Sequence, residues 1–155
     1  MVLRAERLAV LTDPRVARTL GGAPPPEWIP EHIADVQAHW RKHGFGWYAW
    51  LDRETGAFVA RGGPRRAHVG GNDEVEIGWT VRPERWNEGF ATELGAKSTE
   101  LAFGPLGLDD VVSFTLVENV ASRRVMEKLG FAYEGDTDYK GWDHVLYRLG
   151  RTSSA

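Results

Sequence analysis

The sequence contains no cysteine. Its absence excludes a disulfide framework, a thiolate nucleophile and a zinc site built from cysteine ligands. Long apolar runs are also missing, and none approaches the roughly 18 residues of a membrane-spanning helix. The charged residues Arg4, Glu6 and Arg7 interrupt the start of the chain, where a signal peptide would be apolar. We therefore expect a soluble, cytoplasmic protein with no membrane partner and no metal site.

Positive charge is not in excess either. The chain carries 19 basic and 22 acidic residues, which gives a formal net charge of −3. Proteins that hold nucleic acid by phosphate attraction carry the opposite balance, so we expect no nucleic-acid partner. The 155 residues, 42% of them hydrophobic, suffice for one core. We expect a single domain over residues 1–150 and a disordered tail over residues 151–155.

The first third of the chain has apolar residues at helical spacing. Leu8 and Leu11 predict a short helix, and Pro14 is placed to begin a second one. The stretch 21–26, which is rich in glycine and proline, ends this region. A third helix is predicted from Ile29 to His43.

The rest of the chain mixes strand and helix patterns. Segments rich in aromatic and β-branched residues predict three antiparallel strands: Phe45–Leu51, Ala57–Arg61 and Val75–Val81. Two helices and three strands then alternate: helix Gly89–Phe103, strand Val111–Val117, helix Asn119–Leu129, strands Phe131–Tyr133 and Val145–Leu149. The predicted fold class is α+β, with a mixed, mostly antiparallel central sheet flanked by helices and a β-α-β-α-β C-terminal half.

One informative join runs from the strand Val75–Val81 through a loop to Gly89. Backbone N–H groups at a helix N-terminus form an anion site, and small residues such as Gly89 and Ala91 let a diphosphate come close to them. A glycine that serves only a tight strand-to-helix turn would give the same pattern. This motif alone therefore leaves phosphate binding open.

A second motif covers residues 119–131. Asn119 is typical of a helix N-cap, and Gly130 of a left-handed residue that closes a helix. Neither role explains Ser122, which shares a helical face with Met126 and therefore points toward the core. An inward serine needs a partner.

Together the two motifs resemble those of the GNAT superfamily of N-acetyltransferases, in the subgroup similar to ribosomal-protein N-terminal acetyltransferases. The first consists of Glu76-Ile77-Gly78, Pro83-Glu84-Arg85-Trp86 and Glu88-Gly89-Phe90-Ala91-Thr92-Glu93. The second consists of Asn119-Val120-Ala121-Ser122 and Met126-Glu127-Lys128-Leu129-Gly130-Phe131. Their order and their spacing of about thirty residues make the resemblance specific. It covers roughly residues 12–148.

The resemblance implies a GNAT-like fold and transfer of an acetyl group from acetyl-CoA, a co-substrate, to a primary amine by direct attack in a ternary complex. Backbone amides from Glu88 to Thr92 would hold the CoA pyrophosphate. Strand residues would pair with the pantetheine arm, Asn119 would hydrogen-bond it, and Ser122 would lie near the thioester sulfur. The residues assigned to acetyl-CoA are Thr80, Val81, Glu88, Gly89, Phe90, Ala91, Thr92, Asn119 and Ser122.

The chain departs from the family's pattern at three positions. Trp86 stands where the family usually has Gln or Arg, and Glu88 where it commonly has a basic residue or Gln. An acid beside a diphosphate is unfavourable unless its side chain turns to solvent. Met126 occupies the place of a tyrosine general acid, so that role, if needed, would fall to Ser122 or a water.

The chemistry points to a catalytic base. Acetyl transfer needs a neutral amine, and an alkylamine with a pKa of about 10.4 is almost wholly protonated at pH 7, whereas an α-amine near 8 is about 10% neutral. Glu76 is the candidate base, acting directly or through water, beside Ser122 as the second catalytic candidate. A solvent-facing strand carboxylate would explain Glu76 equally well. A backbone N–H near Val81 would meet the oxyanion.

Other questions stay open at this level. A GNAT-like module that binds an acyl-CoA or another small ligand without turnover would carry the same motifs. Within the enzyme class, the acceptor is either a protein N-terminus or a small amine such as an antibiotic or polyamine. His39 and His43 have the spacing of zinc ligands on a helix, but no third ligand suggests itself, which favours solvated histidines.

The start of the chain differs from that of the family. Relatives usually open with a β-strand, whereas residues 1–4 allow at most a marginal strand before the first predicted helix. A missing edge strand would leave the backbone of its neighbour exposed. We expect either that the natural protein begins upstream of Met1 or that a partner subunit covers this edge in a homodimer.

Overall fold

A computed structural model describes residues 9–22, 24–25 and 27–152 of the chain. The N-terminal part contains a 3-10 turn, η1 (Ala9–Thr12), and a short helix, α2 (Pro14–Ala17). The Asp13 carboxylate accepts a hydrogen bond from the Arg15 N–H (2.8 Å), which caps α2. The longer helix α3 (Trp28–His43) ends at the left-handed Gly44. The predicted succession of two short helical segments and one longer helix is confirmed.

Six strands form one mixed sheet. They are β1 (Tyr48–Leu51), β2 (Phe58–Val69), β3 (Asn72–Val81), β4 (Asp110–Leu116), β5 (Ala132–Tyr139) and β6 (Trp142–Gly150). Their spatial order is β1-β2-β3-β4-β6-β5. The β3–β4 pair is parallel and the other four pairs are antiparallel, which confirms the predicted α+β fold class.

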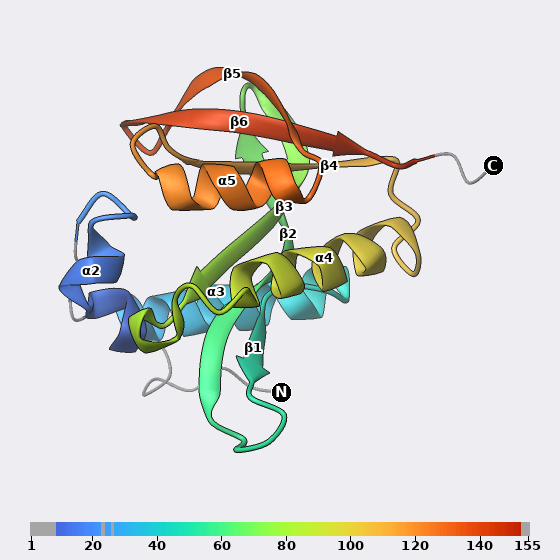
Figure 1. Ribbon diagram of the computed structural model, residues 1–155. Helices are drawn as coiled ribbons and strands as arrows, with labels where there is room; N and C mark the ends of the chain where they lie inside the picture. The colour runs from blue at the N-terminus through green and yellow to red at the C-terminus, as the bar shows by residue number, and fades with distance from the viewer. Residues whose placement is uncertain (1–8, 23, 26, 153–155) are drawn as a thin grey trace.

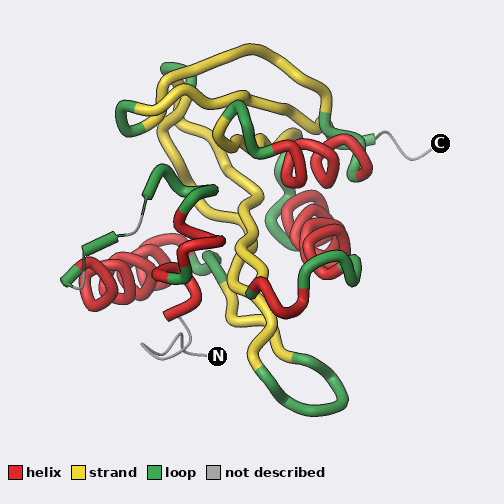
Figure 2. The backbone as a smooth tube through the Cα atoms, turned by 60° about the vertical axis from the view of Figure 1, so that its left-hand side comes forward, coloured by secondary structure: helices red, strands yellow, loops and turns green. Residues whose placement is uncertain are grey.

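Helices cover both faces of this sheet. A 3-10 turn, η2 (Pro83–Arg85), leads from β3 to α4 (Phe90–Phe103), and α5 (Val120–Lys128) follows β4. Figure 2 shows α4 and α5 on one side of the sheet and α3 on the other. The main core lies under α4 and α5, and its buried residues are Phe45, Val75, Ile77, Ala102, Val111, Met126, Phe131, Val145 and Tyr147.

Four strands, β2, β3, β5 and β6, are longer than the sequence predicts, and the largest differences are in β2 and β5. The prediction ends one strand at Arg61 because Gly62-Gly63-Pro64 is typical of a turn, but β2 continues to Val69. A Cβ atom at Gly62 would collide with the carbonyl oxygen of Gly78, so this glycine serves a close approach of two strands. β5 likewise runs on beyond Tyr133, as half of a hairpin with β6.

The two central strands, β3 and β4, are paired at one point and separate beyond it. β3 and β4 share a single bridge, Glu76 to Val112. Near this bridge the Arg148 guanidinium of β6 binds carboxylates on three other strands at 2.8–3.1 Å: Glu74, Asp110 and Glu134. Beyond it the strands diverge, so that β4, β6 and β5 lie at the top of Figure 1, whereas β1 and the start of β2 lie below.

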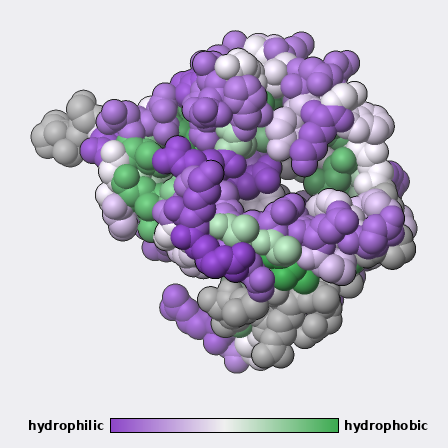
Figure 3. Space-filling model, turned by 180° about the vertical axis from the view of Figure 1, so that it is seen from behind, coloured by the Kyte–Doolittle hydropathy of each residue, from purple (hydrophilic) through white to green (hydrophobic). Residues whose placement is uncertain are grey.

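The ends and surface bear on other expectations. Residues 1–8 lie outside the described residues, and they include residues 1–4, which allowed at most a marginal first strand. Arg151, assigned by the sequence to the tail, donates hydrogen bonds to the carbonyls of Phe103, Leu108 and Asp109. Among the described residues no helix is both long and apolar enough to cross a membrane. The face in Figure 3 is mostly hydrophilic, with apolar residues in small separate areas.

Candidate active site

The split between β3 and β4 exposes backbone groups inside the sheet. In an antiparallel pair, residues alternate between those whose N–H and C=O face the partner strand and those whose groups face away. The Arg82 N–H donates to the Val59 carbonyl (2.9 Å), and the β2–β3 register continues from there without a shift. The backbone groups of Thr80 therefore face β2, whereas those of Trp79 and Val81 face β4.

Side chains satisfy some of these groups. The Ser113 hydroxyl donates to the Ile77 carbonyl (2.8 Å), just past the bridge where β4 begins to diverge. The Trp86 indole N–H donates to the Val81 carbonyl (2.8 Å) at the end of β3. Trp86, which departs from the family's pattern, therefore has a structural contact here. The N–H of Val81 and both backbone groups of Trp79 remain directed into the split.

The α4 N-terminus follows Val81 by one loop. Gly89 is left-handed (φ +84°), caps the helix without a side-chain hydrogen bond, and has open space where a Cβ would lie. The Glu93 N–H donates to the Gly89 carbonyl (3.0 Å) as the first helical bond. The preceding amides of Phe90, Ala91 and Thr92 have no earlier turn of helix to bind, so they are available to an anion.

The acidic Glu88 next to this turn is neutralised by its neighbours. Its carboxylate accepts a hydrogen bond from Arg85 (2.9 Å), and its side chain is nearly half exposed. Arg85 also binds Asp52 on the β1–β2 loop (2.9 Å). The hydrogen bonds to Glu88 and Asp52 raise the pKa of Arg85. The carboxylate of Glu88 is therefore paired with a cation and turned toward solvent. In this position it does not oppose a diphosphate at the α4 N-terminus.

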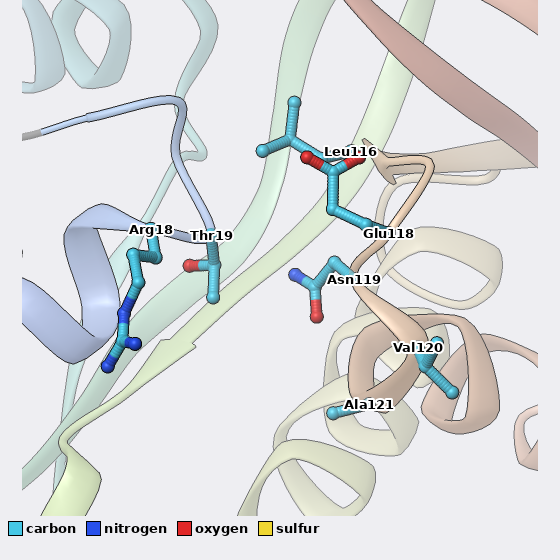
Figure 4. A pocket seen from close by; sticks show the side chains of 7 residues that line it. All are labelled: Arg18, Thr19, Leu116, Glu118, Asn119, Val120 and Ala121. Atoms are coloured by element: carbon cyan, nitrogen blue, oxygen red, sulfur yellow. The ribbon is translucent and has the colours of Figure 1, made fainter.

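A pocket of about 370 Å³ lies between α2 and the start of α5. Figure 4 shows Thr19 and Asn119 facing each other across it. The Asn119 carbonyl oxygen accepts the Ser122 N–H (3.3 Å), which confirms the predicted cap, and its NH₂ donates to Thr115 (2.9 Å). Ser122 is half-buried, and its hydroxyl has no hydrogen-bond partner within the described part of the chain.

Glu76 is buried on β3 beside the bridge to β4. Its Oε1 accepts a hydrogen bond from the Arg65 Nε (2.8 Å), and no described residue binds its Oε2. A Cβ at Gly78 would lie 3.3 Å from Oε1, so the carboxylate extends along β3 toward the open split. The alternative of a solvent-facing carboxylate is wrong, because the side chain is only 6% exposed.

The sequence analysis missed an aromatic and cationic cluster beside Glu76. The guanidinium carbons of Arg61 and Arg65 lie 4.0 and 4.2 Å from the ring centroid of Trp47. His32 of α3 stacks on Trp28 with ring centroids 4.4 Å apart, and its ring lies 5.6 Å from that of Trp47. The continuation of β2 past Gly62, once recognised, would have placed Arg65 opposite Glu76.

The two histidines with zinc-ligand spacing have another role. His39 contacts the Phe45 carbonyl through Nδ1 (2.9 Å), and its Nε2 accepts the Arg66 N–H (3.0 Å). One ring nitrogen of His39 therefore joins α3 to β2, and the other joins it to the segment before β1. The ring of His43 packs against that of His39 (4.5 Å). Across the described ranges, no group of three or more His, Asp or Glu side chains is arranged to hold a metal ion.

The family model for the acetyltransferase (GNAT) domain matches residues 4–132. The chain belongs to the GNAT acetyltransferase family. The predicted enzyme class, an acyltransferase, agrees with this assignment, and the family uses acetyl-CoA and acts on amine acceptors. Met126, in place of the family's frequent tyrosine, is buried in the core and contributes no acid.

Individual relatives agree with the assignment. The chain is similar to the uncharacterized N-acetyltransferase YoaA of Bacillus subtilis, with 40% identity over 39% of this chain and 34% of the relative. It spans only about a quarter to a half of the length of the curated relatives that it matches.

Solved structures share the fold. An acetyltransferase from Agrobacterium tumefaciens has a TM-score of 0.80 at 23% identity, covering 95% of this chain and 84% of that one. The ribosomal-protein-S5-alanine acetyltransferase of Vibrio fischeri has a TM-score of 0.70 at 13% identity, covering 99% and 92%.

Proposed function

We propose that the chain is an acetyl-CoA-dependent N-acetyltransferase that transfers acetyl to a primary amine by direct attack in a ternary complex. The observation that carries this proposal is the split of β3 from β4. It leaves the backbone groups of Trp79 and the N–H of Val81 facing an opening that leads to the α4 N-terminus. An elongated ligand with amides along its length and a diphosphate at one end suits that arrangement.

The donor side of this site consists of Trp79, Val81, the amides 89–92 and Asn119. Acetyl-CoA supplies a thioester as the acyl donor. The α4 amides would bind its diphosphate, and Trp79 and Val81 would bind its amide-bearing arm in the manner of an added strand. This shifts one expectation by a residue, because the backbone of Thr80 faces β2. Ser122, with an unused hydroxyl at the start of α5, would donate a proton to the leaving sulfur.

The acceptor side consists of Glu76, Arg65, Arg61, Trp47 and His32. We assign Glu76 the role of base, with its free Oε2 taking a proton from the amine directly or through one water. Arg65 holds the other oxygen and fixes the direction of the carboxylate. Because Trp47 and α3 shield this face from water, the neutral amine would meet little competition from solvent.

The test is release of free thiol from acetyl-CoA in the presence of a panel of amines, beside calorimetric titration with CoA. The panel contains peptides with free N-termini, polyamines, aminoglycosides and amino acids. Thiol release that depends on one class of amine supports the proposal. Binding of CoA without thiol release on any amine would instead favour a non-catalytic acyl-CoA-binding module, and absence of both would refute the CoA site.

A further inference from the structure

Three buried side-chain atoms in the described part of the chain lack a hydrogen-bond partner, and all three lie in one cluster. They are His32 Nε2, Trp47 Nε1 and Arg61 Nε. Buried polar atoms nearly always have partners, because an unpaired one loses its hydration without compensation. The ring of Trp47 contacts both of the others. Such a concentration of unused polar atoms beside a proposed base indicates a place for a polar group of the substrate.

Arg61 gives that place its charge. The residue is 6% exposed, and among the described side chains it has no ion-pair or hydrogen-bond partner. Arg65, on the same face of β2, is neutralised by Glu76. Burial lowers the pKa of Arg61 to about 9, so it stays charged at neutral pH. One positive charge is therefore buried without a counter-ion, which is costly unless an anion joins it.

We propose that Arg61, Trp47 and His32 form a subsite for the carboxylate of the acceptor, so that the substrate is a small amine that also carries a carboxylate. The inference rests on the proposed function and names its substrate class. A guanidinium binds a carboxylate through two parallel N–H donors, and the Trp47 N–H adds a third donor. Arg65 contacts both Trp47 and Glu76, so one small molecule can present its carboxylate to Arg61 and its amine to Glu76.

The burial of the subsite favours a small acceptor over a protein. Trp47 is 8% exposed and Arg61 6%. His32 lies between Trp28 and Trp47 on the same side. A single net charge also matches a carboxylate better than a phosphate, which carries close to two negative charges at neutral pH. The subsite therefore favours acceptors that carry one negative charge and are short enough to enter beneath α3.

The experiment compares acceptors that differ only in carboxylate against carboxamide: glycine and glycinamide, β-alanine and β-alaninamide, 4-aminobutanoate and 4-aminobutanamide. Amides have the less basic amine and so the larger neutral fraction, which favours them chemically. We expect the carboxylate of the best-fitting pair to be preferred by about tenfold or more in kcat/KM, because a charge-assisted bond is lost in the amide. Ratios near or below one in every pair would overturn the inference.

Arg61→Met removes the charge while keeping the length of the side chain. The preference ratio should fall to near one, and Arg61→Lys should restore part of it. Arg66→Gln is the matched control, because Arg66 lies on the same strand but is exposed. It should leave the preference ratio unchanged. Because Arg61→Met removes an uncompensated buried charge, its midpoint of thermal unfolding should not fall. A retained ratio, or a lower midpoint with every acceptor affected equally, would make Arg61 structural and overturn the proposal.

Three further acceptors and a binding measurement test the charge and the size of the substrate. A preference for O-phosphoethanolamine over β-alanine would overturn the carboxylate assignment. A charge preference found only between peptides beginning Ser-Glu and Ser-Gln would overturn the small-acceptor assignment. Calorimetry with N-acetyl-β-alanine and its carboxamide measures the affinity of the subsite for a carboxylate in the absence of turnover. Failure of thiol release with every amine would refute the proposed function, whereas equal binding of these two products would refute the subsite.

Discussion

The two sides of the candidate site are built from different parts of the polypeptide. On the donor side the groups are mainly backbone N–H and C=O, and most lie within one stretch of chain from Trp79 to Thr92. On the acceptor side they are side chains that arrive from α3, β2, β3 and the segment before β1. The groups proposed to bind acetyl-CoA can therefore be encoded by one short stretch of sequence. The choice of acceptor instead depends on side chains that long-range packing brings together.

The most severe test of this comparison is Gly89→Glu. A side chain would enter the open space in front of the α4 amides and bring a negative charge to the place proposed for a diphosphate. We expect affinity for acetyl-CoA, measured by calorimetry, to fall about a hundredfold or more. Gly107→Glu is the matched control, because Gly107 is also left-handed with free space around it but lies beyond α4. An unchanged dissociation constant in Gly89→Glu would remove α4 from the donor side.

Glu76→Gln tests the acceptor side. The amide keeps the shape of the carboxylate but cannot take a proton, so kcat should fall about a hundredfold. Glu74→Gln is the control: Glu74 also lies on β3 and is also paired with an arginine, Arg148. Equal losses in both variants would show that an ion pair, not a base, had been removed.

These expectations show what the sequence could and could not predict. It could predict Gly89, Asn119 and the alternation of helices and strands, because caps, glycines and periodicity are local signals. It could not predict the extent of β2, since Gly62-Gly63-Pro64 has the local pattern of a turn and only the close approach of Gly78 explains it. Because the predicted strand ended at Arg61, Arg65 was not placed on a strand, and its pairing with Glu76 could not be predicted.

Residues at the junction of the two sides should show smaller effects. Ser122→Ala should lower kcat about tenfold with little change in KM, since the hydroxyl is proposed to act on the leaving group. Asn119→Ala should mainly raise KM for acetyl-CoA and cost about 1 kcal/mol of stability, because Asn119 caps α5. Steady-state kinetics decide the matter: equal, small changes in both constants would leave the pair with a capping role alone.

The smallest effect concerns stability in acid and belongs to the acceptor side. Burial, and then the nearby cations Arg61 and Arg65, lower the pKa of His32 to about 3 from an ordinary value of 6.5. Neutral His32 therefore contributes fully to stability above pH 6.5, and the contribution is lost as the pH falls toward 3. In denaturant titrations, the loss of stability between pH 7 and pH 5 should be smaller by about 1 kcal/mol in His32→Leu, allowing for partial exposure.

The exposed His68 supplies the control for that experiment. His39 and His43 also have pKa values lowered chiefly by burial, so they add to the same decline and remain in both variants. If His32→Leu and His68→Gln gave superimposable profiles, the acid sensitivity would not reside in the acceptor side.

Because β3 and β4 share a single bridge, both strands have an unpaired edge in the interior of the sheet. Edge strands are places where foreign chains add and aggregates begin, and proteins usually guard them with bulges, charges or covering groups. Here the side chains of Ser113 and Trp86 donate hydrogen bonds to the carbonyls of Ile77 and Val81. The backbone groups between these two carbonyls remain free for an extended ligand. In amide hydrogen exchange, Trp79 and Val81 should behave like edge residues although their strand is central, and occupation of the gap should slow them as a neighbouring strand would.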